Sequence, residues 1–160
     1  FKDYREIDSR YSNIASIEMF EAVGKKYWEK YFDVIKKSLV NSGKAALQII
    51  TIDENRSANY QNQPDFIQQY IFPGGMLPTK KELLEINHKI GLDFNEVKSF
   101  GLSYAKTLNM WNSQFQNSWQ DLLQLGFNQR FKRMWEFYLA YCETGFLSKS
   151  TDVSHFLINK

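Results

Sequence analysis

Two carboxylates follow the first apolar segment of the chain, where they could take part in acid–base chemistry. Residues 13–24 read Asn-Ile-Ala-Ser-Ile-Glu-Met-Phe-Glu-Ala-Val-Gly, so Glu18 and Glu21 end a segment with strand character, just before Gly24. Open parallel sheets hold their ligands at the carboxyl ends of their strands. We therefore expect both carboxylates where a substrate would bind.

Each of these polar residues also has a structural interpretation. Glu21 can cap the helix that follows, because a carboxylate is stabilised at a helix N-terminus. Glu18 is interpreted as a solvated residue on the other face of the strand. Gln48 lies within a second apolar segment, and a neighbouring loop could supply the partners that its amide needs if it is buried.

The apolar pattern predicts a strand–helix–strand unit at the start of the chain. Residues 13–19 and 45–52 have the composition of buried strands, and residues 25–39 carry apolar side chains at the spacing of an amphipathic helix. This order predicts a right-handed crossover and a parallel sheet, covered on both faces. The polar segment 53–64 is expected to be mobile, and 65–71 to form a short helix.

The second half of the chain adds more helix and two further strands. Thr79 and Glu82 match a capping box, and the helix that they begin should end at Gly91. The remaining pattern predicts a strand, two long helices and a final strand, at 92–100, 104–123, 128–146 and 151–159. The sequence therefore predicts an α/β fold with a mixed, mostly parallel sheet and a helical insertion.

The composition is that of one globular domain with many aromatic residues. A net charge of +2 on 160 residues gives no electrostatic argument for nucleic acid. One cysteine and two widely separated histidines favour neither a disulfide framework nor a metal site, and a reducing cytoplasm is expected. Aromatic residues reach 16%, which suits either a large aromatic core or a channel for a long apolar ligand.

A glycine-rich turn after the first strand, which a nucleotide-like cofactor needs, is missing from the sequence. Gly74 and Gly75 lie between two prolines and come too late in the chain. If the fold binds such a cofactor, its first strand precedes residue 1. The chain also opens without Met, so we expect a fragment or a processed product.

Four ordered motifs together resemble the cyclopropane-fatty-acyl-phospholipid synthase family, which includes the mycolic acid cyclopropane synthases. They read S-I-E-M-F-E-A-V-G, Y-I-F-P-G-G-M-L-P, F-G-L-S-Y-A-K-T-L and R-F-K-R-M-W-E-F-Y-L-A-Y-C, at residues 16–24, 70–78, 100–108 and 130–142. The resemblance implies a Rossmann-like S-adenosylmethionine-dependent methyltransferase fold. Residues 1–160 would be the C-terminal portion of its one catalytic domain, without the glycine-rich cofactor half.

The resemblance implies methyl transfer to the cis double bond of an unsaturated phospholipid acyl chain, followed by closure to a cyclopropane ring. Its cofactors would be S-adenosylmethionine and bicarbonate, and its place the cytoplasmic, inner face of a membrane, as a peripheral protein. The isolated chain should be inactive, and an exposed sheet edge would favour a homo-oligomer. Three alternatives stay open: a methyl- or methylene-branched lipid product, methylation of a small amine, and a truncated, non-catalytic lipid-binding module.

The resemblance also implies roles for individual residues. The catalytic, bicarbonate-binding positions are Glu21, Gln48, Ile50 and Tyr104. The cofactor-binding positions are Tyr4, Arg5, Ser16 and Ile17. The acyl-pocket positions are Phe72, Leu77, Leu108, Tyr138 and Cys142. Well-studied members carry a histidine where this chain has Gln48; an amide can donate to an anion but cannot shuttle a proton near neutral pH.

Several of these side chains have a second interpretation from their spacing alone. Tyr104 could be a core residue at a helix start. The helical stripe Phe131, Trp135, Tyr138 and Cys142 could be ordinary core or the wall of an acyl tunnel. Cys142 is not expected to be a nucleophile, because no base is evident near it. The cluster Arg130, Lys132 and Arg133 could meet lipid phosphates or be a solvated helix face.

Overall fold

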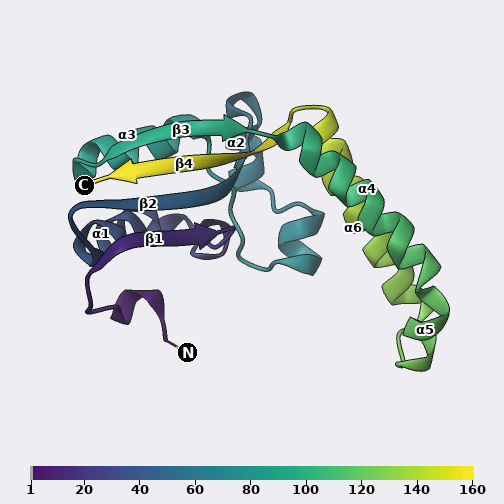
Figure 1. The fold of residues 1–160 in the computed structure, drawn as a ribbon. Coiled ribbons are helices and arrows are strands. Elements are labelled where there is room, and N and C mark those ends of the chain that lie inside the picture. The colour runs from purple at the N-terminus through teal and green to yellow at the C-terminus, as the bar shows by residue number, and fades with distance from the viewer. Residues whose placement is uncertain (1) are drawn as a thin grey trace. The chain divides into compact units, whose positions relative to one another are not determined.

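A computed structural model describes residues 2–160, which form two compact units (Figure 1). The first unit runs to Ser99 and includes Val153–Lys160, and the second is Phe100–Asp152. The first unit contains a four-stranded sheet, and the second is helical. The two units are described separately below.

The sheet of the first unit has the order β1-β2-β4-β3. Its strands are β1 (Tyr11–Ile17), β2 (Leu39–Ile52), β3 (Asp93–Ser99) and β4 (Thr151–Asn159). Strands β1 and β2 are parallel, with Ile17 opposite Gln48, and β3 is antiparallel to β4. Backbone hydrogen bonds join Ser42 and Gly43 to Lys160, so the start of β2 lies beside the end of β4. The predicted mixed sheet and its parallel strand–helix–strand unit are therefore confirmed.

The first unit also contains several helices. They are η1 (Tyr4–Glu6), η2 (Phe20–Ala22), η3 (Lys25–Tyr27), α1 (Trp28–Ser38), α2 (Glu54–Asn62), the π-helical turn η4 (Ile67–Ile71) and α3 (Lys80–Ile90). Most of the polar segment 53–64, which was expected to be mobile, forms helix α2. Asp53 caps it, its side chain accepting a hydrogen bond from the Asn55 amide, and Glu54 follows in the first turn. Helix α3 has the predicted capping box and ends at Gly91, which has a φ of 73°.

Helices α1 and α3 lie on one face of the sheet (Figure 1). Buried aromatic residues of η2 and α1, among them Phe20, Trp28 and Phe32, pack there against β2 and β4. Each fully buried ring of this kind contributes about 2–3 kcal/mol through the apolar area removed from water. The opposite face carries Ile17, which is 63% exposed, and the exposed Ala46. The helices of this unit therefore cover one face, whereas the sequence predicted cover on both.

The second unit consists of α4 (Gly101–Asn117), α5 (Trp119–Gln124) and α6 (Gln129–Leu147). A single helix was expected at 104–123, but it breaks at Ser118, whose ψ of 3° leaves the helical range. Asn128 caps α6 by accepting a hydrogen bond from the Phe131 amide at 3.0 Å. Among residues 2–160, no helix is long and apolar enough to cross a membrane.

Candidate functional site

Glu21 is held by the backbone of the neighbouring strand. It lies in η2, directly after β1, and its Oε1 accepts a hydrogen bond from the Ile50 amide of β2 at 2.6 Å. Next to it in η2, Phe20 is fully buried, so the core fixes this turn at the carboxyl end of β1. The carboxylate therefore does not cap the following helix, which was the structural alternative.

The second oxygen of Glu21 is buried without a hydrogen-bond partner among the described residues. Burial raises the pKa of this carboxyl to about 7, and the nearby carboxylate of Glu18 contributes in the same direction. A carboxyl with this pKa is partly protonated at neutral pH. It can therefore donate a hydrogen bond from Oε2 to an anion as well as accept one.

Glu18 and Gln48 form a second polar group at the same strand end. Gln48 donates from Nε2 to Glu18 Oε1 at 2.7 Å, and the Glu18 amide donates to the Gln48 carbonyl at 2.9 Å. Glu18 has a φ of 50°, in the left-handed region, and follows β1 directly. Its interpretation as a solvated residue is therefore wrong. The loop partner suggested for the Gln48 amide is this carboxylate.

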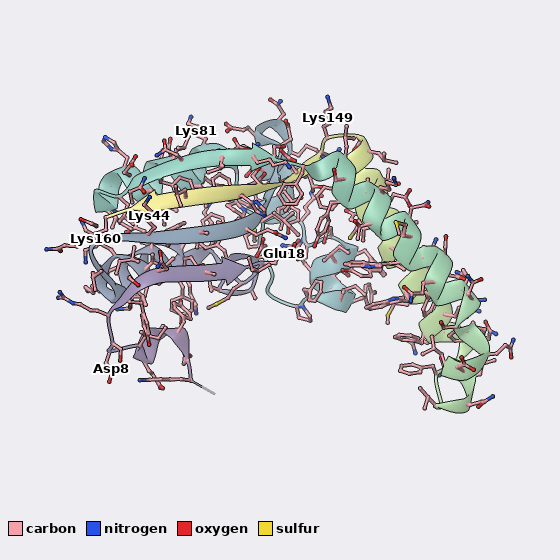
Figure 2. All side chains as sticks on the ribbon, viewed as in Figure 1. Asp8, Glu18, Lys44, Lys81, Lys149 and Lys160 are labelled. Atoms are coloured by element: carbon pink, nitrogen blue, oxygen red, sulfur yellow. The ribbon has the colours of Figure 1, made fainter. Side chains whose placement is uncertain are left out.

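Sequence reasoning missed His155 on β4. Its Nε2 lies 3.0 Å from Gln48 Oε1, so the Gln48 amide lies between a carboxylate and an imidazole. Alternation along β4 could have placed His155 on one face of its strand, but nothing local reveals that β4 lies beside β2. Figure 2 shows Glu18 at this end of the sheet, with Lys44 and Lys160 at the other.

The expected cofactor residues divide into two groups. Tyr4 packs its ring against Tyr31, and Tyr31 donates a hydrogen bond to the Ser16 hydroxyl at 2.6 Å. The Tyr4 hydroxyl is buried without a partner among the described residues. Arg5, in contrast, makes a bidentate ion pair with Asp3. Ile17 exposes its side chain at the end of β1.

The expected acyl-pocket residues occur in both units. Phe72, 56% exposed, and Leu77 belong to the first unit. Leu108 is buried in α4 of the second unit, and Tyr138 and Cys142 are half-buried on α6. That Phe72 and Leu77 line one pocket with Leu108, Tyr138 and Cys142 stays a prediction.

Tyr104 and the stripe on α6 take part in aromatic packing within the second unit. Tyr104 contacts Phe146 edge to face, with 5.1 Å between ring centroids. The stripe belongs to a half-buried aromatic cluster in which Phe131 stacks on Trp135 and Trp135 meets Tyr138. These contacts fit both of the earlier interpretations of the stripe. That Tyr104 meets Glu21 and Gln48 also stays a prediction.

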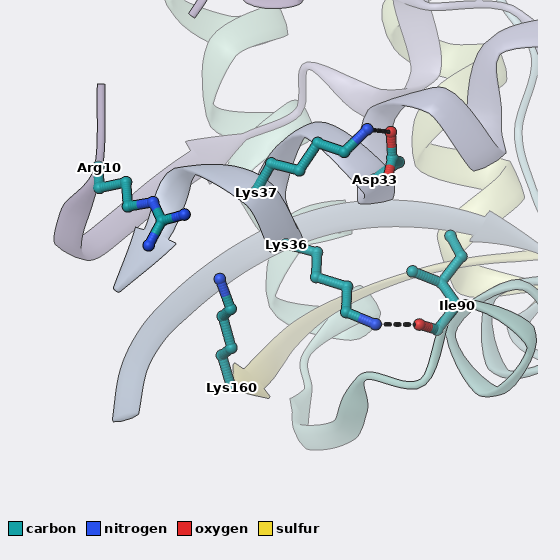
Figure 3. A pocket seen from close by; sticks show the side chains of 6 residues that line it. All are labelled: Arg10, Asp33, Lys36, Lys37, Ile90 and Lys160. Atoms are coloured by element: carbon teal, nitrogen blue, oxygen red, sulfur yellow. Dashed lines mark hydrogen bonds and ion pairs between the residues drawn. The ribbon is translucent and has the colours of Figure 1, made fainter. Parts of the chain in front are cut away.

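A separate basic hollow of about 450 Å³ lies at the opposite end of the strands, where β1 and β2 begin (Figure 3). It is lined by Arg10, Asp33, Lys36, Lys37, Ile90 and Lys160. Its three lysines are engaged: Lys36 with the Ile90 carbonyl, Lys37 with Asp33, and Lys160 with the Leu39 carbonyl. This hollow therefore does not offer three free ammonium groups to a ligand.

Comparisons with known proteins agree over nearly the whole chain. Residues 1–156 match the family model described as mycolic acid cyclopropane synthetase. The chain is 40% identical over 152 residues to tuberculostearic acid methyltransferase UfaA1 of Mycobacterium tuberculosis. It is 31% identical over 150 residues to cyclopropane-fatty-acyl-phospholipid synthase of Escherichia coli. These alignments cover 94% and 92% of this chain but only 36% and 37% of the relatives.

Comparison with solved structures leads to the same family and shows the fold. Mycolic acid cyclopropane synthase CmaA1, complexed with SAH and CTAB, superposes with a TM-score of 0.89 at 26% identity. The cyclopropane synthase MmaA2 from Mycobacterium tuberculosis superposes with a TM-score of 0.85 at 24% identity. Each match covers 98% of this chain and 58% of the other. The chain thus has the fold of S-adenosylmethionine-dependent methyltransferases and spans little more than a third to three fifths of these proteins.

Proposed function

Because the chain belongs to the mycolic acid cyclopropane synthetase family, we propose that it forms part of an enzyme that methylates unsaturated phospholipid acyl chains and closes a cyclopropane ring. The family and the methyltransferase fold are its premises. The observation that carries the proposal is the buried Glu21 carboxyl, held by Ile50 with one oxygen left unpartnered. A carboxyl in this state is suited to hold a small oxyacid beside an acyl chain.

Residues 1–160 are proposed to be the C-terminal portion of one catalytic domain. The missing glycine-rich turn supports this, because the phosphate- or cofactor-cradling turn follows the first strand in such folds. The partial coverage of the relatives supports it as well. The parent protein is therefore the form in which activity should be measured.

The residues present fit both implied cofactors. When bound, S-adenosylmethionine would supply the methyl group, and bicarbonate would accept the proton that this transferred methyl group loses as the ring closes. Tyr4, Ser16 and Ile17 would contact S-adenosylmethionine, and the unpartnered Tyr4 hydroxyl is a free group for it. Arg5 is less suited, because Asp3 holds its guanidinium.

Bicarbonate would be held by Glu21, Gln48 and Tyr104. A protonated Glu21 removes the repulsion between two anions, since its Oε2 then donates a hydrogen bond. The amide of Gln48 and the phenol of Tyr104 are further donors. Ile50 was expected to contact the bicarbonate directly. Its amide instead donates to the Glu21 carboxyl, so Ile50 would act on the anion only by positioning Glu21.

The acyl chain would lie against Phe72, Leu77, Leu108, Tyr138 and Cys142. The aromatic cluster of the second unit, which joins Phe115, Trp119, Phe127, Phe131, Trp135 and Tyr138, supports this assignment. Aromatic faces bury hydrocarbon and also stabilise a nearby cation. Cation stabilisation suits a reaction in which the methylated alkene becomes positively charged.

The substrate places the parent protein at a membrane surface, on the cytoplasmic side and as a peripheral protein. The turn between α5 and α6 supports this, because Leu125 is 75% exposed there and Phe127 is 39% exposed. Arg130 and Arg133 follow in the first turns of α6 and are exposed. Apolar residues at a tip with cations behind them are suited to an anionic lipid surface.

The test is methyl transfer by the parent protein. Incubation with methyl-labelled S-adenosylmethionine and an unsaturated phospholipid should put the label into the lipid. Mass spectrometry separates a cyclopropane from a methyl-branched product, and proton NMR separates it from a methylene-branched isomer of equal mass. An unlabelled lipid fraction would overturn the proposal. Label in a small amine would favour amine methylation, and lipid binding without any transfer would favour a non-catalytic module.

A methyl- or methylene-branched lipid is the second candidate product. It is favoured by the 40% identity to a protein named tuberculostearic acid methyltransferase. Gln48 is compatible with this product, because an amide cannot relay a proton as a histidine would. The proton could therefore be lost from a different carbon than in cyclopropane formation. The same incubation distinguishes a cyclopropane from a methylene branch, since both form from the alkene and the transferred methyl group alone. A saturated methyl branch also needs a hydride donor, so a parallel incubation contains a reduced nicotinamide cofactor.

A further inference from the structure

The Gln48 side chain is held at both ends. Its Nε2 donates to Glu18 Oε1 at 2.7 Å, and its Oε1 lies 3.0 Å from His155 Nε2. The three residues come from the end of β1, from β2 and from β4. Gln48 is half-buried, so its polar atoms are only partly served by water.

These contacts fix which way the amide points. The carbonyl and amino ends of an amide have nearly the same shape, so an unsupported side chain can present either end to a ligand. A carboxylate oxygen accepts from the amino end, and the carbonyl can only accept, so His155 must donate through Nε2–H. Glu18 thus selects this orientation, and His155 supports it in the tautomer that carries its proton on Nε2.

This orientation leaves one donor available. An amino group has two N–H bonds, and Glu18 takes one of them. Gln48 makes no other side-chain hydrogen bond within residues 2–160. Ile50, which holds Glu21, lies two positions further along β2, or about 6–7 Å. A donor at Gln48 and a protonated Glu21 Oε2 are therefore neighbours at one strand end.

We propose that His155 is a positioning residue that locks the Gln48 amide with its N–H toward the oxyanion site, so that the site attracts rather than repels an anion. This inference rests on the proposed function, in which bicarbonate occupies that site. Without the imidazole, the amide can turn and present its carbonyl oxygen, which an anion avoids. The hydrogen bond to Glu18 is then the only contact that opposes this rotation of the amide.

The experiment measures how the activity of the parent protein depends on added sodium bicarbonate in carbonate-depleted buffer. His155→Leu fills a similar volume without a donor, whereas His155→Gln keeps an N–H donor of similar reach. The matched control is His88→Ala, which changes the only other histidine, exposed on α3. Circular dichroism and thermal unfolding establish that each variant is folded.

We expect His155→Leu to raise the half-saturating bicarbonate concentration about tenfold, the size of one lost hydrogen bond to a charged ligand, with kcat at saturating bicarbonate nearly unchanged. His155→Gln should restore most of this loss, and His88→Ala should match the wild type. A histidine that only supports the fold would lower activity at every bicarbonate concentration and would not be rescued by glutamine.

A double-mutant cycle tests the route through Gln48. In a Gln48→Met background, His155→Leu should have no further effect on the bicarbonate dependence. If His155→Leu does not fold, His155→Ala, which also removes the donor, takes its place in the single and double variants. A half-saturating concentration within twofold of wild type in folded His155→Leu would overturn this inference alone. A wild-type parent that methylates no lipid would overturn the proposed function, and this inference with it.

Discussion

At the scale of single residues, the main feature of the site is that only one of the two oxygens of Glu21 has a hydrogen-bond partner in the described chain. One accepts a 2.6 Å hydrogen bond from Ile50, and the other is buried without a partner in the described chain. Leaving a buried polar atom unpaired costs about 1–3 kcal/mol, so such atoms are rare in folded proteins. A ligand that supplies the missing partner would recover this cost. The unpaired oxygen is therefore stronger support for a binding site than the position of Glu21 in the sequence.

The raised pKa of Glu21 predicts a specific pH dependence of stability. The carboxyl has a pKa of about 7 in the fold, against 4.5 ordinarily, so between these pH values the folded protein keeps a proton that the unfolded chain has lost. The contribution of Glu21 to the unfolding free energy therefore falls as the pH rises through this range, by roughly 3 kcal/mol, and is constant above it.

Glu21→Gln is the variant that isolates this effect. Glutamine can still accept from the Ile50 amide but does not titrate, so the variant should gain stability relative to wild type between pH 4.5 and 8. Chemical unfolding of both proteins at a series of pH values measures the difference, and parallel profiles would show that Glu21 does not titrate near neutrality. Carbon-13 NMR of labelled glutamate provides an independent check.

The residues of the site were predictable in unequal measure. Glu21 and Gln48 follow from strand ends and from the family motifs, which are local in sequence. Glu18 was misjudged because its positive φ turns the side chain back toward β2, and a pattern of alternating residues assumes regular strand geometry. His155 was missed because its contact depends on strand order, and 107 residues separate it from Gln48.

At the scale of elements, the short turn η2 connects the core to the site. Phe20 is fully buried, with ring centroids 5.1–5.3 Å from Trp28, Tyr31 and Phe32. Phe20→Ala should cost about 3–5 kcal/mol of stability, as for other large core truncations, and should loosen the Glu21 contact with Ile50. Denaturant unfolding measures the stability change. The matched control is Phe137→Ala, because Phe137 is 51% exposed, and an equal loss there would contradict the role given to Phe20.

The turn between α5 and α6 carries the predicted membrane contact. Replacing Leu125 and Phe127 with serine should weaken binding of the parent protein to anionic phospholipid vesicles by at least about tenfold, since each side chain buries enough apolar area for more than 1.4 kcal/mol. Vesicle co-sedimentation measures the binding. Leu147→Ser is the control, because Leu147 is 57% exposed near the other end of α6. Equal losses in the two proteins would exclude this turn as the contact.

Most elements were predictable because their signals are local. The capping box at Thr79, the stop at Gly91 and the alternation at 151–159 each report on backbone geometry a few residues away. The break at Ser118 was missed because serine is tolerated within helices, and the apolar spacing continues across it. Helix α2 was missed because its segment is polar, although Asp53 and Glu54 carried a capping signal.

At the scale of the whole molecule, the proposed anion site and the aromatic cluster lie in different units of the chain. Glu21, Gln48 and His155 belong to the sheet unit, and the whole aromatic cluster belongs to the helical unit. The helical unit is inserted between β3 and β4, so the sheet is completed only after the insertion ends. Under the proposed function, variation in the insertion would change the acyl chain that is accepted without altering Glu21 or Gln48.

The isolated 160-residue chain should self-associate and should not bind S-adenosylmethionine. Strand β1 lies at an edge of the sheet, and an edge strand presents unpaired N–H and C=O groups to other chains. The sheet face that carries Ile17 is exposed beside it, so both features favour pairing between copies. The missing glycine-rich turn removes the backbone cradle for the cofactor.

Sedimentation velocity and calorimetric titration with S-adenosylmethionine measure these two properties, after circular dichroism has established that the isolated chain is folded. The parent protein is the control, and it should bind the cofactor because the proposed remainder of the catalytic domain would pair with β1 and supply the turn. A folded, monomeric 160-residue chain that binds S-adenosylmethionine would contradict the proposal that the cofactor site needs a part of the domain outside residues 1–160. It would place the whole cofactor site within β1, η1 and α1, where Tyr4, Ser16 and Tyr31 already meet.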